Sequence, residues 1–282
     1  MYLYKERQDV QAFVTQCKNQ HKSIGFVPTM GALHDGHLTL IKRSLTENDV
    51  TIISIFVNPT QFNNQEDLKN YPRTFKEDQL LLEAISKDLV VFAPTSLELY
   101  RGDAKTKSYA FGDLAIQMEG RFRPGHFDGV GTVLHIFFDL LQPDRAYFGE
   151  KDFQQLQIVK KLVEIENLPV TIIGCTIFRE KSGLAFSSRN ERLTKLQHNK
   201  AKLIYETLLN VKNQFGTKSV TQLNKMVEAA FKDHKLFELE YFEIAAVDTL
   251  KTAKTIDPKV KYRAFIAVFA DQVRLIDNIA LN

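Results

Sequence analysis

Two histidines three residues apart, His34 and His37, are the side chains of this sequence best suited to chemistry on a phosphate. They follow an apolar run at 24–27 and a glycine-containing turn at 28–31, and they precede an amphipathic segment at 38–45. This order predicts a strand, a tight turn and the start of a helix. A helix N-terminus leaves N–H groups unpaired and carries a partial positive charge, so it attracts phosphate. Imidazoles at that point could stabilise the charge that builds on oxygen in a phosphorus transition state.

The same histidine pair permits two other interpretations. Histidines at this spacing can share a zinc ion, although no Glu follows the first one as in H-E-x-x-H and no cysteine cluster is near. The two side chains could also lie at the surface or cap the helix without binding any ligand. The local sequence favours phosphate chemistry but leaves all three open.

Amide side chains follow the second apolar run, 50–57. Asn58 and Gln61 stand at the carboxyl end of that expected strand. An amide offers both a donor and an acceptor, so the two side chains suit a small polar substrate. Asn-Pro is also a common turn and Gln61 could be solvated, so the segment alone does not decide.

Two later segments could also bind an anion. Residues 121–129 form a basic, glycine-containing loop, which could clamp an anion or close over a site, or could simply be solvated. Lys151 follows the apolar run 145–148 and precedes another helical pattern, with Gln155 one turn later. This repeats the strand, turn and helix order of the histidine segment, although an ordinary loop with a solvated Lys fits equally well.

A serine pair closes the loop that begins near residue 179. Ser187 and Ser188 are followed by Arg189, just ahead of an expected helix. Two hydroxyls and a guanidinium could hold phosphoryl oxygens. Serines also cap helices routinely, and that is the favoured interpretation of this segment taken alone.

The bulk composition is that of an ordinary globular protein: 282 residues, 44% hydrophobic and 25% charged. With 37 basic and 34 acidic residues the net charge is +3, which is too balanced to indicate nucleic acid or an anionic membrane as partner. Cys17 and Cys175 lie far apart without metal-type spacing, which favours a reducing compartment. Neither an apolar leader nor a run of about 18 apolar residues occurs. We therefore expect a cytoplasmic protein.

The first 175 residues alternate apolar runs with helical periods. Continuous runs, typical of parallel strands covered on both faces, lie at 24–27, 50–57, 89–93, 145–148 and 170–173. Apolar stripes at 130–141 and 153–163 predict helices between them. The alternation predicts a doubly wound parallel sheet, an α/β fold with ligands at the carboxyl ends of its strands.

The pattern changes after about residue 176. Helical stretches at about 190–213 and 218–234 precede three expected strands at 239–247, 262–270 and 273–280. These elements predict a smaller C-terminal α+β domain. The expected division is therefore residues 1–176 and residues 177–282.

Taken together, the motifs resemble the pantoate–β-alanine ligase (pantothenate synthetase) family. The matching stretches, in the order in which the family has them, are PTMGALHDGH at 28–37, SIFVNPTQF at 54–62, YPRT at 71–74, GRFRPGHFDGV at 120–130, YFGEKDFQQ at 147–155 and REKSGLAFSSRN at 179–190. The HxGH tetrad alone is shared by a wide nucleotidylyltransferase superfamily. The combination is specific, and it spans nearly the whole chain.

The resemblance implies an ATP-dependent ligase with a Rossmann-like core. The carboxylate of pantoate attacks the α-phosphate of ATP, which gives pantoyl adenylate and pyrophosphate, and the amine of β-alanine then displaces AMP. ATP is a substrate in this scheme and Mg²⁺ accompanies it. In-line attack at phosphorus requires positioning and charge stabilisation more than covalent catalysis.

The resemblance also implies residue roles. The catalytic residues would be His34, His37, Lys151, Ser187 and Ser188, with His37 at the position that the family treats as proton donor. The ATP site would comprise Met30, Gly31, Ala32, Leu33, His34, Asp35, Gly36, His37, Gly149, Glu150, Lys151, Asp152, Phe178, Phe186, Ser187, Ser188 and Arg189.

The acceptor site and the adenine wall complete this implied assignment. Gln61 and Gln155 would contact pantoate, with Gln61 also bordering the amine pocket, and Asn58 would support them. Phe178 and Phe186 stand where the family often has smaller apolar residues, so the wall of the nucleotide site would differ in size but stay apolar.

The resemblance implies a homodimer, and a second domain that closes over the site to keep the adenylate from water. The metal ligands are not assigned, although Asp78 is a candidate for supporting the metal or its waters. One alternative is an HxGH nucleotidylyltransferase that acts on a phosphorylated acceptor; the neutral amides of Gln61 and Gln155 argue against it. Another is a nucleic-acid-binding module, which the balanced charge disfavours.

Overall fold

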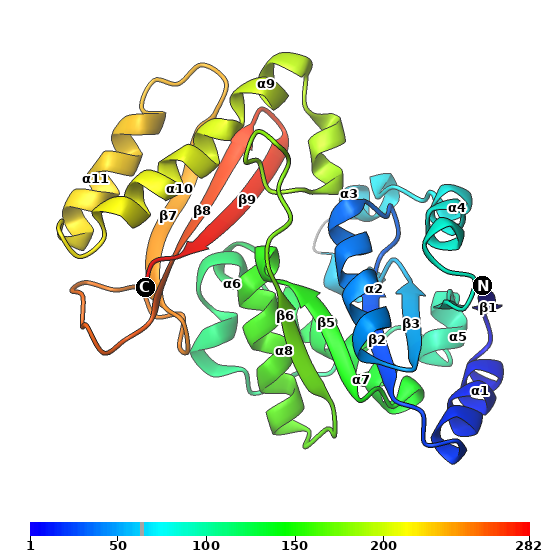
Figure 1. Ribbon diagram of the computed structural model, residues 1–282. Helices are drawn as coiled ribbons and strands as arrows, with labels where there is room; N and C mark the ends of the chain where they lie inside the picture. The colour runs from blue at the N-terminus through cyan, green and yellow to red at the C-terminus, as the bar shows by residue number, and fades with distance from the viewer. Residues whose placement is uncertain (63–64) are drawn as a thin grey trace. The chain divides into compact units, whose positions relative to one another are not determined.

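The computed structural model describes residues 1–62 and 65–282, which form two compact units (Figure 1). Unit 1 comprises Met1–Glu150 and Gln154–Thr176, and unit 2 comprises Lys151–Phe153 and Ile177–Asn282. Along the sequence, the long segment of unit 2 begins at residue 177, directly after unit 1 ends at residue 176. The short segment Lys151–Phe153 belongs with unit 2 although unit 1 flanks it in the sequence.

Unit 1 is built on a six-stranded sheet in which every neighbouring pair is parallel. In spatial order the strands are β1 (Tyr2–Tyr4), β4 (Val90–Phe92), β3 (Val50–Ile55), β2 (Ile24–Thr29), β5 (Arg145–Gly149) and β6 (Thr171–Cys175). The predicted parallel sheet is confirmed, and so are its five predicted strands within two residues at each end. Strand β1 was missed because it is only three residues long and two of them are exposed.

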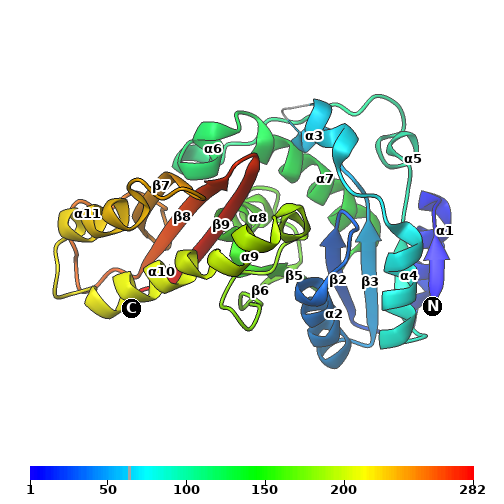
Figure 2. The ribbon, with the colours of Figure 1, turned by 90° about the horizontal axis from the view of Figure 1, so that it is seen from above.

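Helices cover both faces of this sheet (Figures 1 and 2). They are α1 (Arg7–Asn19), α2 (Asp35–Glu47), α3 (Gln65–Asn70), α4 (Phe75–Ile85), α5 (Ser96–Tyr100), α6 (Met118–Phe122), α7 (His126–Leu141) and α8 (Phe153–Ile165), with 3₁₀ helices η1 (Pro59–Gln61), η2 (Gly112–Ala115) and η3 (Glu150–Asp152). Successive strand residues face opposite ways: Phe26 packs on Phe137 of α7, whereas Val27 joins a cluster with Ile41 of α2 and Leu82 of α4.

The strand order places a topological switch point between β2 and β5. From β2 the chain proceeds through β3 to β4 on one side, and it then returns to β5 on the other side of β2. In open α/β sheets, ligands bind in the crevice outside the carboxyl ends of the strands at such a point. The turn after β2 and the turn after β5 therefore flank the expected ligand position of unit 1.

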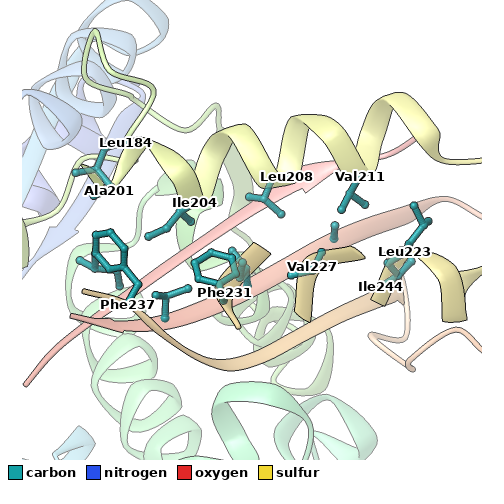
Figure 3. Packing of buried hydrophobic residues seen from close by; sticks show 14 of the residues in the cluster. Leu184, Ala201, Ile204, Leu208, Val211, Leu223, Val227, Phe231, Phe237 and Ile244 are labelled. Carbon is teal, nitrogen blue, oxygen red and sulfur yellow. The ribbon is translucent and has the colours of Figure 1, made fainter. Parts of the chain in front are cut away.

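Unit 2 is an α+β unit around an antiparallel three-stranded sheet, as predicted. Its elements are η4 (Ser188–Arg192), α9 (Lys195–Lys200), α10 (Lys202–Gln214), α11 (Val220–Phe231), β7 (Glu238–Ala246), β8 (Tyr262–Ala270) and β9 (Val273–Ala280). Figure 3 shows the core, in which Ile204 and Leu208 of α10 and Val227 of α11 pack over the sheet. The apolar spacing along both helices supplies this contact.

The predicted helix at 190–213 is wrong as a single element. The chain instead forms η4, α9 and α10, and Thr194 and Gln197 make the capping box that starts α9 after η4. Each of the two side chains hydrogen-bonds to the backbone of the other residue, so the helix cannot continue through residue 194. The helix predicted at 218–234 is the shorter α11, and Ser219 caps it in the same way.

Candidate functional site

The two histidines lie at the N-terminus of α2, directly after the turn that ends β2. His34 occupies the N-cap position with an extended backbone, and its ring stacks on that of His37 with 4.0 Å between centroids and 27° between planes. Both side chains are partly exposed. The N–H groups of the first turn and the two imidazoles thus form one polar surface beside the switch point.

A buried carboxylate holds the turn that presents them. Asp78 is 1% exposed, and its two carboxylate oxygens accept hydrogen bonds from the backbone N–H groups of Ala32 (3.0 Å) and Leu33 (2.8 Å). Gly31 has φ +80°, a conformation that favours glycine. A Cβ at Gly31 would also approach the Asp78 carboxylate to 3.0 Å. Asp78 therefore shapes the turn, which is a structural role that the sequence did not reveal.

Asn58 and Gln61 lie beyond the carboxyl end of β3, and the structure joins them to the turn. The Asn58 amide donates to Gln61 Oε1 at 3.1 Å, and Gln61 Nε2 approaches Met30 Sδ to 3.0 Å. Asn58 is 1% exposed and caps η1, where its Oδ1 also accepts from the Tyr100 hydroxyl at 2.6 Å. Asn58 is therefore a buried support, whereas the half-buried Gln61 is the member of the pair open to a ligand.

The loop predicted at 121–129 is wrong: these residues are the end of α6, a short turn at 123–125 and the first turn of α7, and they pack against Gln61. His126 Nδ1 lies 2.8 Å from the Gln61 carbonyl oxygen, and an Arg123 guanidinium N–H donates to the same oxygen at 3.3 Å. Gly129 lies so close to Thr60 that a Cβ would overlap the Thr60 carbonyl. The turn and the start of α7 thus fix the backbone that carries Gln61, and Gly129 is needed for the close approach.

The turn after β5 begins at Gly149 and continues through η3. Within this turn, unit 1 extends as far as Glu150. Gln155 lies on the first turn of α8, where it is partly exposed. The neighbouring Gln154 is different: it is 4% exposed, and its amide bonds to the Glu119 N–H and to the carbonyls of Leu114 and Gln117. Of the two glutamines, only Gln155 is available to a substrate.

In unit 2, three of the predicted phosphate ligands line one small pocket. Lys151, Ser187 and Arg189 surround it together with Arg274 and Asp277. The Lys151 side chain is 15% exposed, and its ammonium lies 3.7 Å from the carboxylate of Asp152, which is itself exposed. Residues far apart in the sequence are thus brought to a cavity whose charged lining is Lys151, Arg189, Arg274 and the carboxylate of Asp277.

The segment before Ser187 is a short hairpin. Arg179 pairs with Ala185, and the rings of Phe178 and Phe186 lie 5.8 Å apart. Phe178 is 36% exposed, so the two rings offer an apolar surface. Ser187 caps η4 by accepting from the Arg189 N–H at 3.3 Å, so the capping interpretation of this serine is confirmed. Ser188 follows as the first residue of η4 and is partly exposed.

A buried ion pair anchors the hairpin. The Arg179 guanidinium makes a bidentate contact with Asp277 at 2.6 and 2.9 Å and stacks on the Tyr205 ring at 3.8 Å. Burial raises the pKa of Asp277, and the hydrogen bonds and charge of Arg179 act in the opposite direction. The charged pair is favoured because both carboxylate oxygens are hydrogen-bonded.

Metal ligation has little support from the residues that the structure describes. Within 1–62 and 65–282, no three His, Cys, Asp or Glu side chains are grouped so that they could hold a metal ion. Asp78 is a poor candidate, since the backbone of the turn occupies both its oxygens. A Mg²⁺ ion that takes most of its ligands from phosphates and water needs no such cluster.

The described helices also include none that combines enough length with enough apolar character to cross a membrane. Cys17 and Cys175 are both buried, and each is a free thiol.

The sequence and the fold match proteins of one family. The family model for pantoate–beta-alanine ligase matches residues 2–280. The pantothenate synthetase of Flavobacterium psychrophilum is 51% identical over 282 residues, which cover 100% of both chains. That of Bacteroides thetaiotaomicron is 46% identical over 271 residues, 96% of this chain and 95% of the relative.

Solved structures agree. Pantothenate synthetase from Thermus thermophilus superposes with a TM-score of 0.91 at 37% identity, covering 100% of this chain and 99% of the other. The pantoate–beta-alanine ligase of Francisella tularensis, described as a complex with beta-gamma ATP and beta-alanine, gives a TM-score of 0.81 at 35% identity, covering 100% and 98%.

Proposed function

The chain belongs to the pantoate–β-alanine ligase family and joins pantoate to β-alanine, and we propose that it does so by adenylating pantoate at the His34–His37 turn. One observation carries the proposal: the stacked imidazoles stand at the N-terminus of α2, beside the switch point between β2 and β5. A helix N-terminus with two imidazoles suits a phosphate whose charge increases during reaction. The α-phosphate of ATP is the target that this chemistry requires.

The first step forms one bond and breaks one. A carboxylate oxygen of pantoate attacks the α-phosphorus of ATP, the bond to the β-phosphate oxygen breaks, and pyrophosphate leaves with the electron pair. His37 and His34 stabilise the developing negative charge by hydrogen bonding, and the leaving group departs in line with the attack. In the second step the amine of β-alanine attacks the pantoyl carbonyl, loses a proton and expels AMP.

The acceptor side of the site is formed by two half-buried amides, those of Gln61 and Gln155. Gln61 and Gln155 bind the carboxylate and hydroxyl groups of pantoate, and Gln61 also borders the position of the amine. Asn58 supports Gln61 through the 3.1 Å hydrogen bond between their amides. Neutral amides fit a small hydroxylated acid, because a phosphorylated acceptor would require further basic groups.

The proposed ATP ligands are assigned for each unit separately. From unit 1 we assign Met30, Gly31, Ala32, Leu33, Asp35, Gly36, Gly149 and Glu150 alongside the two histidines. From unit 2 we assign Lys151, Ser188 and the pocket residues Ser187 and Arg189 to the phosphates, Asp152 to the rest of the ATP site, and Phe178 and Phe186 to the apolar wall. Lys151 and Arg189 supply positive charge, and the serines supply hydroxyl donors.

Mg²⁺ enters as the partner of ATP in this proposal. The ATP phosphates and water would provide its ligands, so the protein would need no dedicated cage. Exchange activity that EDTA abolishes and added Mg²⁺ restores would support this assignment.

We further propose that the enzyme is a cytoplasmic homodimer. Two buried cysteines with free thiols fit a reducing compartment. Light scattering on the purified chain would test the dimer, and cell fractionation would test the compartment.

The deciding experiment is pantoate-dependent exchange of labelled pyrophosphate into ATP in the absence of β-alanine. The first step is reversible, so the purified protein should catalyse this exchange with ATP and pantoate. Addition of β-alanine should convert the exchange into net formation of AMP. Turnover of CTP or of a phosphorylated acceptor, with no exchange on pantoate, would refute the proposal.

A further inference from the structure

A buried side chain of β9 holds the backbone of Lys151 within unit 2. The Asn278 amide near the end of β9 donates a hydrogen bond to the Lys151 carbonyl oxygen at 2.8 Å. Asn278 is 2% exposed, and the two residues are 127 positions apart. Because a carbonyl is rigidly linked to its own Cα, this bond fixes where the Lys151 side chain begins.

Asn278 is itself held from the other side. The buried Arg263 guanidinium donates to the Asn278 Oδ1, so the amide cannot turn over without losing both contacts. The same guanidinium lies over the Phe153 ring at 4.1 Å, and Phe153 also contacts Phe265. These contacts hold both Lys151 and Phe153, the two ends of the segment, which is why Lys151–Phe153 belongs to unit 2 and not to unit 1.

Asp277, the residue before Asn278, positions the segment that carries the other proposed phosphate ligands. Asp277 binds the Arg179 guanidinium through both oxygens, and Arg179 begins the hairpin that leads to Ser187. The Arg179 guanidinium also donates to the Asn278 carbonyl at 3.3 Å. Two consecutive residues of β9 thus anchor the two segments that line the pocket.

We propose that Asn278 is a positioning residue for adenylation, acting through Lys151. Asn278 positions the Lys151 ammonium where it can bind the ATP phosphates. The Asp277–Arg179 pair positions Ser187 and Arg189, which line the same pocket. This inference rests on the proposed function, since it assigns Lys151 to the phosphates. A misplacement of about 1 Å is enough to reduce the rate of a positioned reaction on the order of 100-fold.

Asn278→Asp is the sharpest variant, because it keeps the size and the acceptor for Arg263 but removes the donor to Lys151. Pantoate-dependent exchange should fall at least tenfold, mainly in kcat. The double variant with Lys151→Ala gives the decisive readout. If Asn278 acts through Lys151, the same change in the Lys151→Ala background should reduce exchange by less than twofold.

The second half-reaction provides an internal control. When synthetic pantoyl adenylate is supplied, the Asn278→Asp variant should form the amide with β-alanine at a rate within twofold of the parent, because no phosphate transfer remains. Asn282→Asp is the matched control: Asn282 also bridges two backbone groups, but these belong to Tyr262 and Val260 and not to Lys151. Its exchange rate should stay at the parent value.

Three results would overturn the inference. These are unchanged exchange in Asn278→Asp, an equal fold loss in both Lys151 backgrounds, or a parallel loss of the amide-forming step. If Asn278→Asp does not fold, Asn278→Ser enters the same cycle, and failure of both variants to fold would assign the residue to stability instead. Absence of exchange in the parent protein would refute the proposed function, so the two failures are distinguishable.

Discussion

The turn at Met30–His37 and the hairpin at 178–186 present proposed ATP ligands in two different ways. In unit 1, strand geometry and one carboxylate do the positioning: Asp78 accepts two backbone N–H groups, and the turn follows directly from β2. In unit 2, the hairpin depends on a side-chain ion pair between Arg179 and Asp277. One region is held through backbone donors, and the other through a charged pair.

Substitutions in the two anchors, Asp78 and the Arg179–Asp277 pair, should therefore have different effects. An ion pair that loses one partner leaves an uncompensated buried charge, which is more costly than a lost neutral hydrogen bond. A backbone-held turn can shift slightly and keep its fold, while the groups that it presents lose their alignment. We expect substitutions in the unit 1 anchor to affect catalysis more than stability, and substitutions in the unit 2 anchor to do the reverse.

The largest effect should come from the ligand that the unit 1 turn presents. His37→Asn removes the imidazole and should lower pantoate-dependent exchange by about 10²- to 10⁴-fold, the usual range for a proton-transferring or charge-stabilising group. Circular dichroism should show an unchanged fold. His21→Asn, which alters an exposed histidine, is the control and should retain full exchange. A normal rate for His37→Asn would remove the imidazole from the mechanism.

Breaking the unit 2 anchor should have the largest effect on stability. The Asp277 side chain is 3% exposed and that of Arg179 is 16% exposed, so Asp277→Ala leaves a guanidinium buried without its partner. The free energy of unfolding of unit 2 should fall by about 3–5 kcal/mol. Urea titration followed by circular dichroism measures it.

The control for this substitution is an exposed pair in the same unit. Lys202 and Glu206 form an ion pair with side chains 52% and 54% exposed, so Glu206→Ala should change stability by less than about 1 kcal/mol. Similar losses in Glu206→Ala and Asp277→Ala would show that burial does not distinguish the two pairs.

Weakening the unit 1 anchor should separate catalysis from folding. In Asp78→Asn, one of the two backbone N–H groups of Ala32 and Leu33 faces an amide NH₂ instead of an acceptor. Stability should fall by about 1–3 kcal/mol, and exchange should fall about tenfold because the histidines move with the turn. The matched control is Asp88→Asn at an exposed position. A stability loss with normal exchange would contradict the difference drawn between the two regions.

The sequence predicted most elements but few of the anchors. Five of the six parallel strands were recognisable because strands covered on both faces are continuously apolar. The histidine turn and the pocket residues Lys151, Ser187 and Arg189 were found from motifs. Asp78 and Asn278 were not assigned these structural roles, because their contacts cross 45 and 127 residues of sequence. Local sequence patterns do not predict contacts between residues so far apart.

Unit 1 should also lose stability at alkaline pH, through a side chain that belongs to neither anchor. In unit 1, burial and then the charge of Glu166 raise the pKa of Tyr109 to about 12 from its usual 10. Between these values the native state keeps a proton that the unfolded state has lost, so stability falls as pH rises.

Tyr109→Phe should therefore reduce the pH dependence of the free energy of unfolding of unit 1. The variant retains the ring that stacks on Phe111 at 5.2 Å but cannot ionise. Because Tyr109 is only half buried, solvent screening reduces the contribution to about 1 kcal/mol between about pH 10 and 12. Urea unfolding at about pH 9, 10 and 11, which spans the usual tyrosine pKa, measures it, with the exposed Tyr2→Phe as the control. An equally steep decline in the parent and in Tyr109→Phe would place the alkaline sensitivity of unit 1 elsewhere.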